Sequence, residues 1–130
     1  MPKLSSDERW KRYNKKLEEL MELNDFFGLG TTYYKMAIFL EKEGKDASHL
    51  RTLGYKMKLR SQSDDLERFR ESGVTKNVEI VATDDSCDKC KKLNHKVLSI
   101  KEAESRRLIP VKECTHKYGC RCIYLPVIET

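Results

Sequence analysis

The five cysteines constrain this chain more than any other feature, because none occurs in the first 86 residues. They form a C-x-x-C pair, Cys87 and Cys90, and a later group made of Cys114, Cys120 and Cys122. A C-x-x-C pair followed by a second segment bearing cysteine and histidine has the spacing of a structural zinc site. We therefore predict that the two groups converge on one Zn²⁺ ion.

The second group also contains a histidine, so the chain offers more donors than the four that a tetrahedral zinc ion needs. The candidate ligands are Cys87, Cys90, Cys114, His116, Cys120 and Cys122. We place Cys87 and Cys90 first, because a C-x-x-C turn holds two sulfurs at the separation that the metal requires. Cys120 comes next, with its side chain on the same face of an extended segment as that of Cys122. The fourth ligand stays open among Cys114, His116 and Cys122.

The composition gives a physical reason for a metal in this part of the chain. Charged residues make up 36% of the 130 residues and apolar residues 38%, so the apolar core is small. The final third of the chain would bury too little apolar surface to fold by itself, and a bound metal supplies the missing free energy. The net charge of +5, from 26 basic and 21 acidic residues, is too small to argue for nucleic-acid binding.

Hydrophobic periodicity and capping residues predict three amphipathic helices in the first half of the chain. The first runs from Ser6 to Asn24 behind a capping box at Ser5–Glu8, the second from Thr31 or Thr32 to just before Gly44, and the third from a cap at Asp46 or Ser48 to Gly73. Basic residues on the third helix are interspersed with acidic ones. They are Arg51, Lys56, Lys58, Arg60, Arg68 and Arg70. Such mixed charge is typical of a solvated helix face, with a phosphate-binding face as the alternative.

The chain changes character after Gly73. Alternating apolar residues predict a strand within residues 74–83, a second strand at Lys96–Ser99 and a last strand from Cys122 to Ile128. A turn at Asn94-His95, with Asn94 left-handed, joins the first two, and a second capping box opens a short helix from Ser99 to about Arg107. The predicted fold is α+β, with an N-terminal three-helix bundle in residues 1–73 and a small zinc-stabilised β-hairpin and helix module in residues 74–130.

The order of features in the C-terminal part resembles a known family. An aspartate-bearing turn leads into C-x-x-C, and a hairpin, a short helix, a proline, a histidine and Cys-Arg-Cys follow before the last strand. The residues in this pattern are Asp84, Asp85, Cys87, Cys90, Val97, Pro110, His116, Cys120, Arg121, Cys122, Pro126 and Val127. Over about residues 78–128 the chain resembles the Mu F-like phage minor head proteins, which are head-morphogenesis proteins of phages and prophages.

Two features depart from that family. Its hairpin usually turns at Asp-Gly, where this chain has Asn94-His95. Its histidine usually stands three residues before Cys-Arg-Cys, whereas His116 stands four before Cys120 and shares its loop with Cys114. The ligand set therefore stays open. The resemblance implies an assembly or binding role in a bacterial or phage-infected cell.

The thiols and the lack of a membrane segment suggest where the protein works. No apolar run has the length of a membrane span, and the first residues open onto charge instead of a signal-peptide core. We expect a cytoplasmic protein without a membrane partner. In that reducing compartment, an odd number of thiols is more consistent with metal ligands than with disulfides.

The leading hypothesis for function is a zinc-stabilised binding or assembly module with a structural metal site. We expect a protein partner, with a nucleic acid as the alternative; the sequence does not indicate an oligomeric state. No catalytic residue and no organic cofactor are assigned. The alternative function is a zinc-dependent nuclease of the histidine-metal type, in which His95 or His116 and a nearby carboxylate activate water. Against it stand the lack of paired catalytic histidines and a surplus of donors, which favours a closed metal shell.

Overall fold

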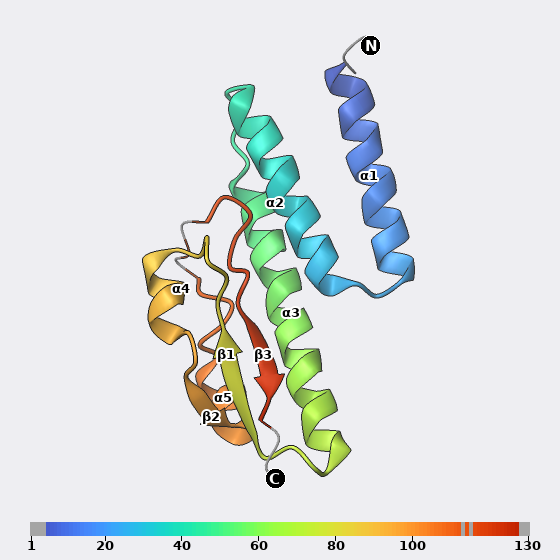
Figure 1. Cartoon of the computed structure of the whole chain (residues 1–130). Helices are drawn as coiled ribbons and strands as arrows, with labels where there is room; N and C mark the ends of the chain where they lie inside the picture. Colours follow the sequence, from blue (N-terminus) through green and yellow to red (C-terminus); the bar gives the residue numbers. More distant parts are fainter. Residues whose placement is uncertain (1–4, 113, 115, 128–130) are drawn as a thin grey trace.

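The described residues of a computed structural model, 5–112, 114 and 116–127, form three helices followed by a small sheet with two short helices (Figure 1). In chain order the elements are α1 (Ser6–Glu22), α2 (Phe26–Lys42), α3 (Ser48–Ser72), β1 (Asn77–Val81), α4 (Asp88–Leu93), β2 (Val97–Ser99), α5 (Ile100–Arg106) and β3 (Ile123–Pro126). The predicted α+β class and the three N-terminal helices are confirmed. Ile128, the predicted end of the last strand, lies outside the described residues.

Side-chain hydrogen bonds explain where α1 and α3 begin. The Ser5 hydroxyl oxygen accepts the backbone N–H of Glu8 at 3.2 Å, which is half of the predicted capping box. Ahead of α3, a carboxylate oxygen of Asp46 accepts the backbone N–H of Ser48 at 3.0 Å. Gly73 ends α3 in the left-handed conformation, with φ of 74°. The predicted start of the first helix and the predicted end of the third are confirmed. The first helix ends at Glu22 and not at Asn24, and the N-cap of α3 is Ala47, which has no side-chain capping bond and lies between the two predicted cap residues.

The predicted start of the second helix was wrong. α2 begins at Phe26, ahead of Thr31 and Thr32, because Asp25 caps it: one carboxylate oxygen accepts the backbone N–H of Gly28 at 2.9 Å. Gly28 and Gly30, which also suit a turn, lie inside α2. The Asp25 cap is a local signal that the predicted start at Thr31 or Thr32 did not include.

Gly30 is where α2 crosses α3. A β-carbon at Gly30 would lie 2.9 Å from the carbonyl oxygen of Gly54 and 2.6 Å from Cγ of Lys58, and one at Gly54 would lie 2.8 Å from the Tyr34 ring. Two helices with glycine at the contact can bring their backbones together, which no larger residue allows. The glycines therefore serve close packing between helices despite their low helix propensity.

The sheet is antiparallel, with the order β2-β1-β3. Val78 of β1 pairs with Leu98 of β2, and Ile80 of β1 pairs with Tyr124 of β3. All four side chains are buried in one cluster together with Leu66 of α3. The inner face of the sheet thus rests on the C-terminal half of α3 and on α5.

The C-x-x-C pair lies at the start of α4, which is a short helix. The spacing of the two cysteines alone did not indicate a helix there. Cys87 is the residue before the first turn, and Cys90 is buried within the helix. In the turn that follows, His95 is left-handed, with φ of 69°. The prediction that Asn94 would adopt this conformation was wrong, because the Asn94 side-chain oxygen instead accepts the backbone N–H of Ala82 at 3.0 Å.

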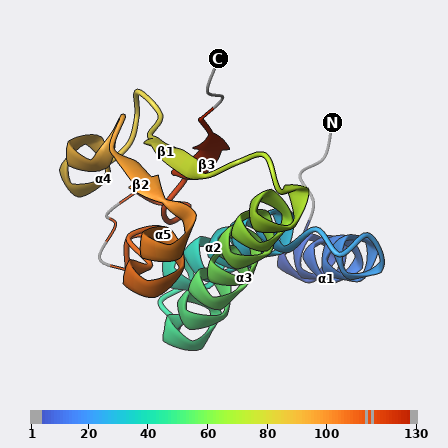
Figure 2. The same cartoon turned by 90° about the horizontal axis from the view of Figure 1, so that it is seen from below.

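The buried apolar side chains form two clusters, and α3 contributes to both. The bundle cluster contains Leu17, Leu20, Leu29, Met36, Ala37, Ala47 and Leu50. The sheet cluster contains Leu66, Val78, Ile80, Cys90, Leu98, Ile100, Ala103, Ile109, Cys120, Cys122 and Tyr124. Figure 2 shows α3 between α1 on one side and α5 on the other. A domain boundary at residue 73 stays a prediction.

The outer face of the sheet carries several exposed apolar side chains. Glu79 in the central strand pairs with Val97 on one side and Leu125 on the other, and Val81 pairs with Ile123. Val97, Leu125 and Ile123 are 54%, 45% and 36% exposed, which is unusual for three neighbouring apolar residues in a sheet. None of the described helices combines the length and the apolar character that crossing a membrane requires.

We predict that Gly30→Ala destabilises the protein by about 1–3 kcal/mol, because the added methyl group overpacks the α2–α3 crossing. On an open helix face the same change would stabilise the protein, since alanine favours helix over glycine. Urea unfolding followed by circular dichroism measures the difference. Lys35→Ala, on the exposed face of α2, is the control and should change stability by less than about 0.5 kcal/mol. An increase in stability for Gly30→Ala would show that the crossing is not tightly packed.

Candidate metal centre

The structure brings the two cysteine groups together although they are far apart in the sequence. Cys87 and Cys90 come from the start of α4, and Cys120 and Cys122 come from the segment that leads into β3. Cys90, Cys120 and Cys122 are buried, Cys87 and Cys114 are partly exposed, and none of these five described cysteines is in a disulfide. The turn ahead of Cys87 forms as predicted, with the Ser86 N–H bonded to the carbonyl of Thr83 at 3.0 Å.

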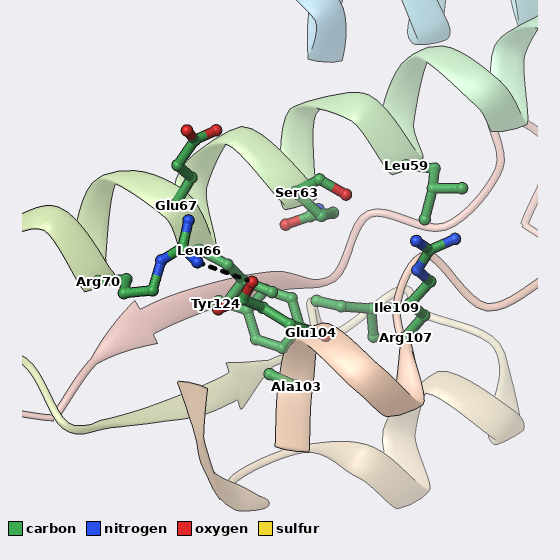
Figure 3. Close-up of a pocket in the computed structure, with 11 residues that line it drawn as sticks. Leu59, Ser63, Leu66, Glu67, Arg70, Ala103, Glu104, Arg107, Ile109 and Tyr124 are labelled. Atoms are coloured by element: carbon green, nitrogen blue, oxygen red, sulfur yellow. Dashed lines mark ion pairs between the residues drawn. The ribbon is translucent and has the colours of Figure 1, made fainter. Parts of the chain in front are cut away.

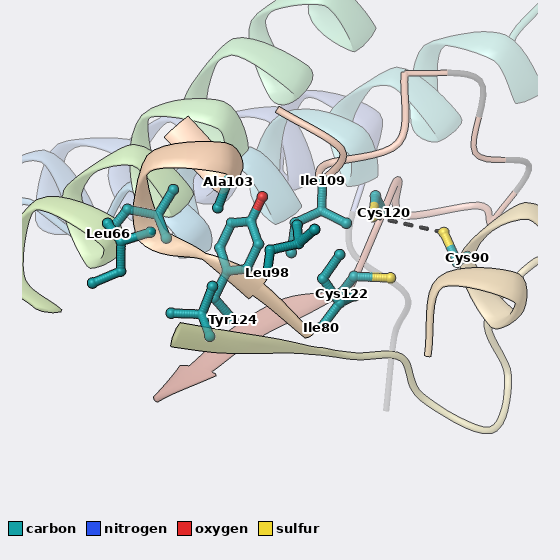
Figure 4. Packing of buried hydrophobic residues seen from close by; sticks show 11 residues of the cluster. Leu66, Ile80, Cys90, Leu98, Ala103, Ile109, Cys120, Cys122 and Tyr124 are labelled. Atoms are coloured by element: carbon teal, nitrogen blue, oxygen red, sulfur yellow. Dashed lines mark hydrogen bonds between the residues drawn. The ribbon is translucent and has the colours of Figure 1, made fainter. Parts of the chain in front are cut away.

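Cys90 is the common member of two groups of sulfur atoms. Its Sγ lies 3.5 Å from that of Cys87, 3.6 Å from that of Cys114 and 3.7 Å from that of Cys120 (Figure 4). In one group the donor atoms of Cys87, Cys90 and Cys114 lie within 4.8 Å of one another, and in the other those of Cys90, Cys120 and Cys122 do. These clusters can hold a metal ion.

The separations between the Cys90 sulfur and its three neighbours match those of tetrahedral coordination. A Zn–S bond of about 2.3 Å places two sulfurs of a tetrahedral site about 3.8 Å apart. The three contacts of Cys90, at 3.5, 3.6 and 3.7 Å, are close to that value. A disulfide needs sulfurs about 2.05 Å apart, so these thiols are gathered without being covalently joined. The predicted convergence of the two cysteine groups is therefore present in the fold.

The pKa values of the thiols diverge within the cluster. A hydrogen bond from the Cys122 thiol, reinforced by the backbone N–H groups of Val111 and Cys122, lowers the pKa of Cys120 to about 6. Burial is the main cause that raises the pKa of Cys90, and the bond to Cys120 raises that of Cys122. Of these three thiols, Cys120 thus ionises most easily, and backbone amides stabilise its thiolate as they do in metal sites.

His116 is held by other partners. Its Nδ1 accepts the backbone N–H of Tyr118 at 3.2 Å, so Nε2 carries the proton and donates it to a carboxylate oxygen of Asp85 at 3.2 Å. Among the described residues, the groups of donors close enough to share a metal contain only cysteines, and His116 belongs to neither. A metal could bind His116 only after one of these hydrogen bonds broke. Its place in the ligand shell stays a prediction.

Asp85 connects the turn before Cys87 to the second cysteine segment. Its carboxylate accepts hydrogen bonds from the Thr83 hydroxyl at 2.6 Å, from His116, and from Arg121 at 3.1 Å. The Thr83 bond, followed by that of His116, holds the pKa of Asp85 near 2. Because Arg121 and His116 belong to the same loop, Asp85 ties that loop to the residues just ahead of the C-x-x-C pair.

His95 lies outside the cluster. The ring nitrogen Nδ1 is 2.7 Å from a carboxylate oxygen of Glu79, at an exposed position on the sheet. His95 is therefore a solvated residue of the turn that the sequence predicts at Asn94-His95. Both histidines that the nuclease alternative invoked therefore lie beside a carboxylate, but each pairs with a different one and neither is grouped with the thiols.

Two buried polar side chains of α3 hold the second cysteine segment in place. Lys58 Nζ donates to the carbonyl oxygens of Tyr118 at 2.8 Å and Cys120 at 2.9 Å. One turn further along, Gln62 Nε2 donates to the carbonyl oxygen of Cys122 at 2.7 Å. Residues four apart share one helix face, so a single stripe of α3 satisfies three backbone carbonyls that burial would otherwise leave without donors.

The prediction that all the basic residues of the third helix are solvated was wrong for Lys58. Its side chain is fully buried, with Nζ 4.8 Å from the centre of the Phe27 ring and 5.4 Å from that of Tyr34. Burial lowers the pKa of Lys58 to about 8, so the ammonium group still predominates at neutral pH. The aromatic faces and the carbonyl oxygens replace the water that the charge gives up. No local signal separates this lysine from its exposed neighbours.

Gly119 completes the contact between the helices and the cysteine segment. Its φ is 77°, and a β-carbon there would collide with the ring of Tyr34. The backbone of the turn can therefore lie directly on α2 only with glycine at this position. The cysteine segment is thus fitted against both α2 and α3.

No model of a protein family matches this chain, and no curated protein or solved structure does either. The resemblance to the Mu F-like head proteins, which concerns residues 78–128, is therefore not tested by these comparisons. What the site does must follow from its own geometry and chemistry.

We predict that Lys58→Met destabilises the protein by about 1–3 kcal/mol, because it leaves two buried carbonyl oxygens without their donor. Methionine keeps an apolar side chain of similar length between the two aromatic rings. Lys56→Met, at an exposed position of the same helix, is the matched control and should change stability by less than about 0.5 kcal/mol. Urea unfolding midpoints measure both. Equal stability of the two variants would show that the Lys58 hydrogen bonds do not hold the cysteine segment.

Proposed function

We propose that this chain is a zinc-stabilised binding module in which Cys87, Cys90, Cys114 and Cys120 hold one Zn²⁺ ion. The observation that carries the proposal is the central position of Cys90, whose sulfur lies 3.5–3.7 Å from those of the other three. Soft thiolate donors favour zinc over the hard cations that prefer oxygen. Cys120 belongs to a different group of sulfurs from Cys87 and Cys114, so zinc binding would have to draw these three sulfurs closer together around Cys90. Cytoplasmic conditions keep such thiols reduced and available.

The fifth thiol, Cys122, supports the site without binding the metal in this proposal. It is fully buried within the sheet cluster, and its S–H donates to the sulfur of Cys120. A hydrogen bond to a ligating thiolate disperses its charge and orients it, which is the role of outer-shell groups around metals. Lys58 balances the charge further, because four thiolates around Zn²⁺ leave a net charge of −2 and its ammonium group lies beside Cys120.

A closed shell of four thiolates makes the metal structural. Catalytic zinc sites keep one position for water or substrate, whereas four cysteines fill the tetrahedron. The zinc would join α4 to the segment ahead of β3, so that metal binding would contribute to the folding free energy of this part of the chain. A binding or assembly role follows more naturally from such a site than hydrolysis does.

The outer face of the sheet is the surface that we propose for a protein partner. Val97, Ile123 and Leu125 are exposed there on paired strands, around Glu79. Neighbouring apolar side chains on a rigid sheet favour a protein surface over a nucleic acid, which is bound mainly through basic residues. The resemblance to phage head-morphogenesis proteins supports an assembly partner in a bacterial or phage-infected cell.

We predict that the purified protein carries one zinc ion, and that replacing single donors separates ligands from neighbours. Native mass spectrometry should show loss of the ion from Cys87→Ala, Cys90→Ala, Cys114→Ala and Cys120→Ala. Cys122→Ala and His116→Gln are the matched controls and should keep one zinc ion per chain. Circular dichroism of each variant reports whether the helices remain.

The same experiment distinguishes the other ligand sets. Zinc lost from Cys122→Ala but kept by Cys114→Ala would assign the site to Cys87, Cys90, Cys120 and Cys122 instead. Loss from His116→Gln would bring the histidine into the shell. Protein without stoichiometric zinc, and unchanged by a chelator, would refute a structural metal.

We predict that Leu125→Lys abolishes binding of a protein partner captured from the host, because it places a charge within the apolar sheet face. Leu23→Lys, at another exposed leucine beyond the end of α1, is the matched control and should leave binding unchanged. Quantitative pull-down with each variant measures the effect. Equal binding by both variants would exclude the sheet face.

The nucleic-acid and nuclease alternatives have direct tests. DNA binding that weakens steeply as salt increases would indicate contacts to phosphates and replace the protein-partner proposal. Metal-dependent cleavage of plasmid DNA, lost in His116→Ala with the fold intact, would establish catalysis instead of a structural site.

A further inference from the structure

A cleft of about 180 Å³ lies between α1, α2 and the second cysteine segment. The two helices run side by side in opposite directions (Figure 1). The lining includes Arg9 and Tyr13 of α1, Lys35, Phe39 and Lys42 of α2, and Tyr118. A cavity of about 150 Å³ is enough to take up a benzene molecule. The cleft can therefore receive one small aromatic ring.

The charged side chains that line this cleft are all basic. They are those of Arg9, Lys35 and Lys42, and within the described part of the chain none of them forms an ion pair. The only acidic residue of α2, Glu41, is instead paired with Arg51 of α3 at 2.6 Å. Three cations without acidic partners around one opening favour a ligand that carries more than one negative charge.

Three aromatic side chains line the same cleft. The rings of Tyr13 and Phe39 meet edge to face with their centres 5.9 Å apart, which packs α1 against α2. Tyr118 is half-buried, with Lys35 Nζ 5.7 Å and Lys117 Nζ 5.0 Å from the centre of its ring. Aromatic rings beside cations are the combination with which proteins bind nucleotides, because a ring stacks on the base while a cation contacts the phosphate.

Hydrogen bonds of the second cysteine segment hold Tyr118 at the cleft. Its carbonyl oxygen accepts from Lys58 Nζ at 2.8 Å, and its backbone N–H donates to His116 Nδ1 at 3.2 Å. Both bonds use backbone atoms of Tyr118. The ring can therefore be replaced without removing the bonds that position it.

Two other cavities differ from this cleft in charge. The cavity between α3, α5 and β3 is lined by two basic and two acidic side chains, those of Arg70, Arg107, Glu67 and Glu104 (Figure 3). The hollow next to Trp10 is lined by Lys45 together with Asp7 and Glu43. Mixed linings of this kind do not select a multiply charged anion, whereas a lining with basic residues alone does.

We propose that the cleft between α1 and α2 binds a small aromatic phosphate of the nucleotide class. The ring would stack on an aromatic side chain, and the phosphate would accept hydrogen bonds from Lys35 and from a second basic residue. A phosphate monoester carries about 1.5 to 2 negative charges at neutral pH, which suits several cations better than a single carboxylate does. The site contains none of the proposed zinc ligands and none of the exposed apolar residues of the sheet face.

Uridine monophosphate, uridine and inorganic phosphate test the proposal on the protein as purified. The monophosphate offers the ring and the phosphate together, and each of the other two offers one of these parts. Titration followed by backbone amide NMR should show the monophosphate binding at least about 10-fold more tightly than either part, with shifts at α1, α2 and Tyr118. Higher salt should weaken its binding, because salt screens exposed charges.

Variants of Lys35 and Tyr118 make the result specific. Lys35→Gln should weaken uridine monophosphate by about 10-fold, the value of one charged hydrogen bond. Lys56→Gln removes the same charge from an exposed position of α3 and should leave the affinity unchanged. Tyr118→Leu should weaken binding by about 5- to 100-fold through lost stacking, whereas Tyr118→Phe keeps the ring and should bind as the unmodified protein does.

Four outcomes would overturn the proposal. The first two are the absence of shifts at millimolar uridine monophosphate and equal affinity of Lys35→Gln and Lys56→Gln. The third is equal affinity for the monophosphate and inorganic phosphate, which would indicate ion binding at the surface only. The fourth is binding of an oligouridylate more than about 10-fold more tightly than the monophosphate, which would make a nucleic-acid strand the ligand.

Discussion

The rest of this structure depends on one stripe of α3, where Lys58 and Gln62 donate hydrogen bonds to the backbone of the second cysteine segment. These bonds reach the carbonyl oxygens of Tyr118, Cys120 and Cys122. The segment has little regular structure of its own before β3, so its carbonyl groups need donors from elsewhere. The rigid helix α3 supplies these donors. Its hydrogen bonds therefore fix the positions of the two buried cysteines, Cys120 and Cys122, next to Cys90.

Because of these hydrogen bonds, the helical region contributes directly to the structure of the cysteine module. The first half of α3 packs in the bundle through Leu50, and its second half packs under the sheet through Leu66. The crossing at Gly30 and Gly54 brings α2 close enough for the Tyr34 ring to lie against the turn at Gly119. Packing of the helices and geometry of the thiols are therefore coupled through shared contacts. A metal bound at the thiols would stabilise both parts of the chain.

Some elements could be predicted from the residues because their signals are local. Ser5 and Ser99 cap the helices that follow them, at 3.2 and 3.1 Å from the N–H groups of Glu8 and Glu102. The alternation in β1 and the left-handed glycine at the end of α3 are equally local. The predicted start of α2 was wrong because glycines serve both turns and close packing, and only the position of α3 decides between these uses. The burial of Lys58 was not predicted because it too depends on what packs against the helix.

The sequence by itself determined that thiols concentrate in the last third of the chain at metal-ligand spacing, and that helices precede a small sheet. It determined these because spacing, periodicity and caps act over a few residues. Only the tertiary structure decided that Cys90 is the sulfur shared by both groups, that His116 is engaged by Asp85 and Tyr118, and that a buried lysine supports the site. Except for the local bond between Tyr118 and His116, those features depend on contacts between residues 24 to 62 positions apart, which no local pattern encodes.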